Sequence, residues 1–129
     1  QYATHLSIAK ELIREKNGKA RIWNFSMRGM LHGGLWEEQI DVDASAQYYT
    51  TLYKPAGAFD QRLDDYKRVD LSIVRTIAFA KIRWRYSLDI QNVFNFSNTA
   101  WRYYDPYLKA VAGQSQLGII PVLSVQASW

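Results

Sequence analysis

Hydrophobic and polar residues alternate most regularly in the stretch that begins at Ile82. The apolar positions are Ile82, Trp84, Tyr86, Leu88 and Ile90, and the polar positions between them are Arg83, Arg85, Ser87, Asp89 and Gln91. A period of two places the two sets on opposite faces of a β-strand. The pattern predicts a strand with one apolar, partly aromatic face and one charged face.

Less regular alternation recurs in four other segments of the chain. Asn17-Gly18 lies between two of them, flanked by charged residues, and this dipeptide is a strong signal for a two-residue hairpin turn. The composition of residues 9–16 also suits the start of a short helix, but the alternation favours a strand. The predicted strands are residues 2–13, 20–32, 66–77, 81–94 and 115–129.

The predicted connections alternate between short and long. Residues 33–65 begin with Gly33-Gly34 and show no sustained period, and residues 95–114 form a second long loop. Loops of this length are uncommon in compact soluble domains, whereas tight turns at one end and long loops at the other are typical of outer-membrane barrels. We therefore expect an all-β, antiparallel transmembrane β-barrel with both long loops outside and Trp129 at the periplasmic end.

The apolar strand face supports the same interpretation. In a soluble sheet such a face packs against a second apolar layer, whereas in a membrane barrel it meets lipid. Five strands are too few to close a membrane barrel, which needs about eight, and unpaired strand edges are costly in lipid. The remaining strands are expected from an upstream part of a longer precursor or from another chain. Pro121 is expected at a bulge or an unpaired position.

Composition narrows the candidate chemistry. The chain has no cysteine, two histidines and a formal net charge of +4, so disulfides and thiolate metal sites are excluded. The mild basicity is weak support for nucleic-acid binding. We find no nucleophile elbow and no phosphate-binding glycine loop. We therefore expect no enzyme activity, no cofactor and no resident metal. His32 is assigned to the surface or the lumen.

Charged residues fall into two groups. The acidic run of Glu37, Glu38, Asp41 and Asp43 could bind calcium, but its spacing matches no known loop, so a solvated loop is favoured. A second group faces inward on the predicted strands and would form a ladder of opposite charges across the inner wall. That group consists of Arg28, Asp70, Arg83, Arg85 and Asp89.

Aromatic residues also fall into two groups. Trp23, Trp84, Tyr86 and Trp129 lie in phase with the apolar face and suit an interfacial girdle. The second group lies in the long loops, where the rings could stack on a sugar or a metal chelate, or pack against a partner lipoprotein. These possible contact residues are Tyr48, Tyr49, Tyr53, Trp101, Tyr103, Tyr104 and Tyr107.

Several motifs resemble one family of membrane proteins. They are RGMLHGGLWEEQIDVDAS at 28–45, DYKRVDLSI at 65–73, LDIQNVFN at 88–95, YYDP at 103–106 and QLGIIPVLSVQASW at 116–129. In order and spacing they resemble the C-terminal portion of TonB-dependent outer-membrane receptors, particularly the Bacteroidetes-type receptors. The resemblance covers roughly residues 23–129.

The resemblance implies a fold, a location and a role. Residues 1–129 would be the C-terminal part of a plugged barrel of about 22 strands in the bacterial outer membrane, and would supply about its last five strands. The receptor would import a metal chelate, glycan or peptide. Its partners would be outer-membrane lipid, the other strands and the plug, the TonB complex through an absent N-terminal segment, and in some receptors a surface lipoprotein. Leu123, Val125, Ala127 and Trp129 would form the signal that is read during barrel assembly.

Two other functions fit parts of the pattern. One is an outer-membrane barrel with a structural or assembly role, which only the presence of a plug would separate from a transporter. The other is a small soluble OB-like barrel that binds nucleic acid through basic and aromatic residues. The second function explains the strand number but neither the long loops nor the apolar face.

Overall fold

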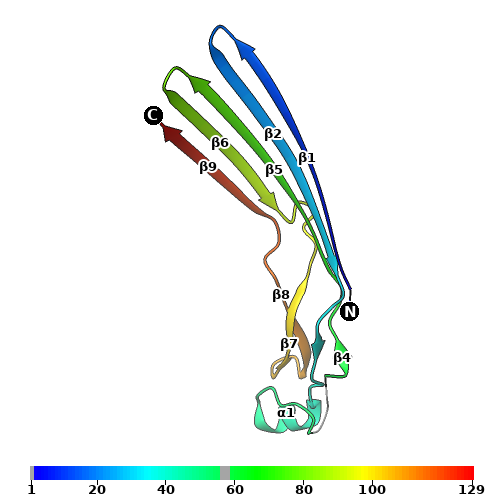
Figure 1. Cartoon of the computed structure of the whole chain (residues 1–129). Helices are drawn as coiled ribbons and strands as arrows, with labels where there is room; N and C mark the ends of the chain where they lie inside the picture. The colour runs from blue at the N-terminus through cyan, green and yellow to red at the C-terminus, as the bar shows by residue number, and fades with distance from the viewer. Residues whose placement is uncertain (1, 56–58) are drawn as a thin grey trace. The chain divides into compact units, whose positions relative to one another are not determined.

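The computed structural model describes residues 2–55 and 59–129 (Figure 1). The chain divides into two compact units. The sheet unit comprises residues 4–31, 67–96 and 118–129, and the loop unit comprises the described residues of 1–3, 32–66 and 97–117. The fold is antiparallel β apart from one short helix, which confirms the all-β part of the predicted class.

Five long strands form one sheet whose members alternate in direction (Figure 1). Along the sheet, each strand lies beside the next long strand in the sequence, so the sheet is a meander with β1 and β9 at its edges. The order across the sheet is β1 (Ala3–Lys16), β2 (Lys19–His32), β5 (Tyr66–Phe79), β6 (Ile82–Gln91) and β9 (Ile120–Ser128).

All five predicted strands are present, with shifted ends. β1 and β5 run further than predicted, to Lys16 and Phe79, whereas β6 ends at Gln91 rather than at residue 94. β6 ends there because Asn92 adopts a positive φ of 52°. The Asn92 side chain also bonds both backbone groups of Phe96, accepting from its N–H at 2.9 Å and donating to its carbonyl at 2.9 Å. This turn is made by the NVFN part of the motif.

Strand register confirms the two faces. Trp84 lies opposite Ile77 in β5 and Ala127 in β9, and Leu88 lies opposite Ile73 and Leu123. Facing residues share a side of the sheet, so the apolar positions of three strands form one continuous surface. This surface, the apolar face, consists of Leu71, Ile73, Ile77, Phe79, Ile82, Trp84, Tyr86, Leu88, Ile90, Leu123 and Val125, and the cation Arg75 lies among them.

No second layer covers the apolar face within the described residues. Trp84 is 43% exposed, Leu88 36% and Leu123 75%. The only buried hydrophobic residues in the described part of the chain are Ile40, Leu63 and Tyr104, and all three belong to the loop unit. The sheet therefore has no core of its own on either side.

The predicted loops 33–65 and 95–114 contain more structure than expected. β3 (Trp36–Glu37) pairs with β4 (Gln61–Arg62), and α1 (Val42–Tyr48) lies between them in sequence. β7 (Thr99–Asp105) and β8 (Ala110–Ser115) form a hairpin. The expectation of two unstructured loops was therefore wrong for these segments. The hairpin's alternation is masked in the sequence by a register shift between Thr99 and Trp101.

Local sequence signals explain the short helix α1 and the close approach of the backbone at Gly34 to Leu63. The Asp41 carboxylate accepts a hydrogen bond from the Ala44 N–H at 3.0 Å and so caps the start of α1, and Tyr49 ends the helix with a φ of 56°. A Cβ on Gly34 would lie 1.8 Å from the Leu63 carbonyl oxygen. Only glycine therefore fits where these two segments meet.

Pro121 is the second residue of β9 and lies opposite Ile90 in unbroken register. Of the two predicted positions, a bulge or an unpaired position, the bulge is absent from this ladder. Proline occurs on edge strands because its missing N–H can face away from the ladder, and β9 is an edge strand of the described sheet.

The turn between β5 and β6 yields a test of backbone strain. Ala80 has a φ of +51° in a two-residue turn, a conformation that costs a side-chain-bearing residue about 1–2 kcal/mol. Ala80→Gly should therefore raise the free energy of unfolding by about 0.5–1 kcal/mol, measured by urea unfolding in detergent micelles. Ala78→Gly, within β5, should lower it by a similar amount. A loss of stability in both variants would contradict this account.

Candidate functional site

Polar residues of three strands surround a hollow of about 250 Å³ on the charged side of the sheet. Arg28, Asp70 and Asp89, all predicted to face inward, line it together. Arg68 Nε donates to Asp70 Oδ1 at 2.7 Å, and the Asn92 N–H donates to the same oxygen at 3.0 Å. The hollow can therefore offer charged donors and acceptors to a polar solute. Its other lining residues include Ser26, Ser72 and Gln91.

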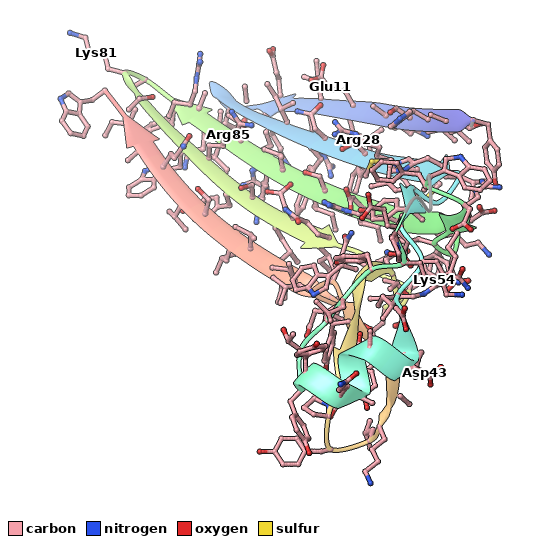
Figure 2. All side chains as sticks on the ribbon, turned by 90° about the horizontal axis from the view of Figure 1, so that it is seen from below. Glu11, Arg28, Asp43, Lys54, Lys81 and Arg85 are labelled. Atoms are coloured by element: carbon pink, nitrogen blue, oxygen red, sulfur yellow. The ribbon has the colours of Figure 1, made fainter. Side chains whose placement is uncertain are left out.

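The predicted charge ladder is only partly formed. Arg83 and Arg85 share the polar side with Asp89, but they lie opposite Ala78 and Thr76 rather than opposite an acid. Figure 2 labels Arg28 on β2 and Arg85 on β6. The ion pair on this face joins Arg68 to Asp70, and Ser72 donates a hydrogen bond to Asp89. Arg68 was not among the predicted residues, although its spacing of two from Asp70 was a usable signal.

The loop aromatics divide by burial. Tyr48, Tyr49, Tyr53 and Trp101 are more than half exposed, and Tyr107 is 96% exposed. Tyr104 is only 4% exposed, so its ring belongs to the core of the loop unit. Its selection as a possible ligand contact was wrong, because alternation along β7 turns Tyr104 to the side opposite Trp101 and Tyr103.

The inner side of β7 binds the two long connections together. Arg102 Nη1 donates to Glu37 Oε1 at 3.0 Å, and the Tyr104 N–H donates to Thr51 Oγ1 at 3.0 Å. α1 lies against β7 (Figure 1). The loop unit is therefore a small folded body built from both connections, and its exposed rings lie on an ordered surface.

The acidic run does not converge on a common point. Glu37 is paired with Arg102, and Asp41 caps α1. Among the residues that the structure describes, no three histidine or acidic side chains gather closely enough to hold a metal ion. His32 stacks on Tyr66, with ring centroids 4.5 Å apart.

Tyr2 contacts Asp65 and Arg62 within the loop unit. Its O–H donates to Asp65, and the guanidinium of Arg62 lies 5.8 Å from its ring centroid. The hydrogen bond to Asp65 is the main cause that raises the pKa of Tyr2 above its ordinary value of 10.0. The phenol therefore stays protonated and keeps donating at neutral pH.

The residues assigned to barrel assembly lie on the edge strand and just beyond it. Leu123 and Val125 are 75% and 55% exposed and share the apolar face, with Ala127 in the same phase. Trp129 follows the end of β9 and is 94% exposed. These side chains are therefore accessible from outside the sheet.

No helix in the described residues is both long and apolar enough to cross a bilayer. Comparison of the chain with protein-family models, with curated proteins and with solved structures finds no match.

Ser45 is the polar centre of the loop unit and provides a test of its folding. Its side chain is fully buried, accepting from the Leu52 N–H at 2.9 Å and donating to the Leu52 carbonyl at 3.3 Å. Ser45→Ala leaves the Leu52 N–H unpaired, whereas the Leu52 carbonyl keeps the hydrogen bond from the Asp41 N–H at 2.8 Å. The substitution should cost about 1–3 kcal/mol, seen as faster amide exchange across residues 40–53.

Ser97→Ala is the matched control for that substitution. Ser97 is exposed, and its side-chain bond joins it to Ser115 at 3.3 Å, so its loss should change exchange little. Equal effects of the two substitutions would refute the central role of Ser45.

Proposed function

We propose that this chain supplies wall strands and outer loops of a TonB-dependent outer-membrane receptor, which imports a metal chelate, glycan or peptide. The observation that carries the proposal is the uncovered apolar face of the sheet. Exposure of so large an apolar surface to water is unfavourable, because burial of each Å² of apolar area contributes about 25 cal/mol of stabilising free energy. Lipid provides the missing cover without a second protein layer.

The open edges of the sheet support the same proposal. β1 and β9 each have one neighbour in the described chain, so each leaves a row of backbone groups unpaired. In hydrocarbon every such group costs several kcal/mol, and only closure with further strands removes the cost. We infer that other strands of the receptor pair with both edges.

The lengths of the connections between the strands support an orientation of the sheet in the membrane. The two-residue turns, at Asn17-Gly18 and Ala80-Lys81, lie at one end of the meander, and both long connections leave from the other. In outer-membrane barrels the long loops are extracellular. The loop unit would then present Tyr48, Tyr49 and Trp101 to an incoming solute or a surface lipoprotein.

The polar side of the sheet suits a lumen. Arg28, Asp70 and Asp89 line a hollow there, and these groups could contact the plug or a passing polar solute. By the family resemblance, energy would arrive from the TonB complex through the plug, and Leu123, Val125, Ala127 and Trp129 would direct insertion. This part of the receptor would contribute no catalytic group.

The rival functions receive less support. An OB-like barrel has Greek-key topology, whereas the five long strands here form a meander with β1 and β9 at opposite edges. A barrel with a purely structural role would share this wall. Sequencing upstream in the gene separates that role from transport, because only the transporter needs a plug with a TonB-contact segment.

A pair of substitutions on neighbouring residues tests the lipid-facing side. Leu88 lies on the apolar face and Ser87 on the polar side. Leu88→Arg should destabilise the barrel in phospholipid bilayers by about 2–4 kcal/mol, measured as the free energy of unfolding. Ser87→Arg should change it by less than about 0.5 kcal/mol. Equal costs would contradict a lipid-facing apolar side.

The absence of cysteine from the chain permits a direct test of topology in whole cells. A single cysteine at Tyr107, which is 96% exposed, should react with a membrane-impermeant maleimide in intact cells. A cysteine at Lys81 should react only after the outer membrane is permeabilised. The unsubstituted chain is the control for background labelling. The reverse pattern would refute the proposed orientation.

A further inference from the structure

Four cations surround the turn between β1 and β2. Arg14, Lys16, Lys19 and Arg21 line a hollow of about 350 Å³ together with Asn17. Like charges facing each other across a hairpin destabilise it, so a cluster of this kind favours an anion among the four side chains.

Ring contacts place the cluster on the apolar face. Lys19 Nζ lies 4.7 Å from the ring centroid of Phe79, which is part of that face. Along β2, Lys19 and Arg21 are in phase with Trp23, and the guanidinium of Arg75 lies 5.0 Å from the Trp23 ring centroid. The cations therefore continue the apolar face beyond its aromatic residues, at the turn end of the sheet.

No acidic group within the described residues neutralises this cluster. Glu11 and Glu15 lie nearby in sequence, but strand alternation turns them to the opposite side from Arg14 and Lys16. The ion pairs Arg62–Asp65, Arg68–Asp70 and Arg102–Glu37 involve none of these four cations. An anion from outside the chain is left as the counter-charge.

Aromatic and cationic residues lie together at the turn end of the sheet. Along β2, Trp23 is followed towards the turn by Arg21 and Lys19, and Lys19 lies beside Phe79, the last residue of β5. Membrane proteins place aromatic residues at the headgroup level, and long cationic side chains extend beyond them towards the headgroups. Lys81 extends from the neighbouring turn at the same end (Figure 2).

We propose that the four cations bind the phosphodiester headgroups of anionic glycerophospholipids, whose acyl chains cover the adjoining apolar face. The inference rests on the proposed function only in requiring that this face meets lipid. Arg75 extends the site into the apolar face. Its guanidinium lies 5.0 Å from the Trp23 ring centroid and adds a further positive charge to this side of the sheet.

Vesicle binding of the full chain tests this site. Partitioning is measured by flotation with vesicles of phosphatidylcholine, with and without phosphatidylglycerol. The wild-type chain should bind both kinds of vesicle and should bind those containing phosphatidylglycerol more tightly. High salt should reduce this gain, because it screens the charges.

Two matched double variants separate the site from overall charge. Arg14→Gln/Arg21→Gln should reduce the gain from phosphatidylglycerol about 30-fold, since each cation near an anionic surface contributes about fivefold. Arg83→Gln/Arg85→Gln also removes two arginine charges, but from the polar side, and should retain the gain. Equal losses in the two variants would overturn the site, because they would show an effect of net charge alone.

A measurement on the unsubstituted chain guards against variants that fail to fold. In zwitterionic micelles, short-chain phosphatidylglycerol should shift the amide resonances of residues 14–21, and short-chain phosphatidylcholine should not. Shifts confined to other residues would overturn the proposal. The proposal would also be overturned if inorganic phosphate abolished the tighter binding to phosphatidylglycerol vesicles and chloride of equal ionic strength did not. Binding of a single-stranded oligonucleotide through Arg14 and Arg21, in place of the lipid, would overturn it as well.

The two proposals fail in distinguishable ways. A chain that does not enter phosphatidylcholine vesicles contradicts the lipid-facing apolar side and hence the proposed function. A chain that enters them but gains nothing from phosphatidylglycerol contradicts only the headgroup site.

Discussion

The sheet has one apolar side and two open edges, and both need partners that the described residues do not contain. In an ordinary β-sandwich a second sheet covers the apolar side. In a soluble barrel the sheet closes on itself, so that no edge remains open. Here Trp84, Leu88 and Leu123 remain exposed, and β1 and β9 stand at opposite edges. A bilayer around a larger barrel satisfies both demands at once, which is why the proposed function follows from packing rather than from any single residue.

The loop unit, unlike the sheet, has buried residues of its own. It has a small core of Ile40, Leu63 and Tyr104, a capped helix and a fully buried serine. Backbone hydrogen bonds join its segments, from the Asp41 N–H to the Leu52 carbonyl and from the Lys54 N–H to the Gln39 carbonyl. The exposed tyrosines are therefore held by an ordered body, and this arrangement suits a surface that must meet a partner repeatedly in one conformation.

Charge is distributed unequally over the two sides of the sheet. On the polar side Asp70 and Asp89 are hydrogen-bonded to Arg68 and Ser72, so part of the charge is balanced internally. On the apolar side the cations gather at the turn end, and no acid in the described part of the chain lines their hollow. A balanced wall on one side and an unbalanced rim on the other are the distribution expected of a strand that meets a wet lumen, hydrocarbon and a headgroup layer.

Alternation in the sequence alone determined the five strands, their two faces and the short hairpin turns, because a period of two needs no tertiary information. The positions of Trp84 and Arg85 on opposite sides followed from it directly. Tertiary structure decided what depends on contacts between segments: the β7–β8 hairpin with its shifted register, the burial of Tyr104, and the bond from the Asn92 N–H to Asp70. The cation cluster depended on both sequence and tertiary structure. Asn17-Gly18 marked the turn in the sequence, but only the ring contacts of Lys19 and Arg75 revealed on which side of the sheet the cations lie.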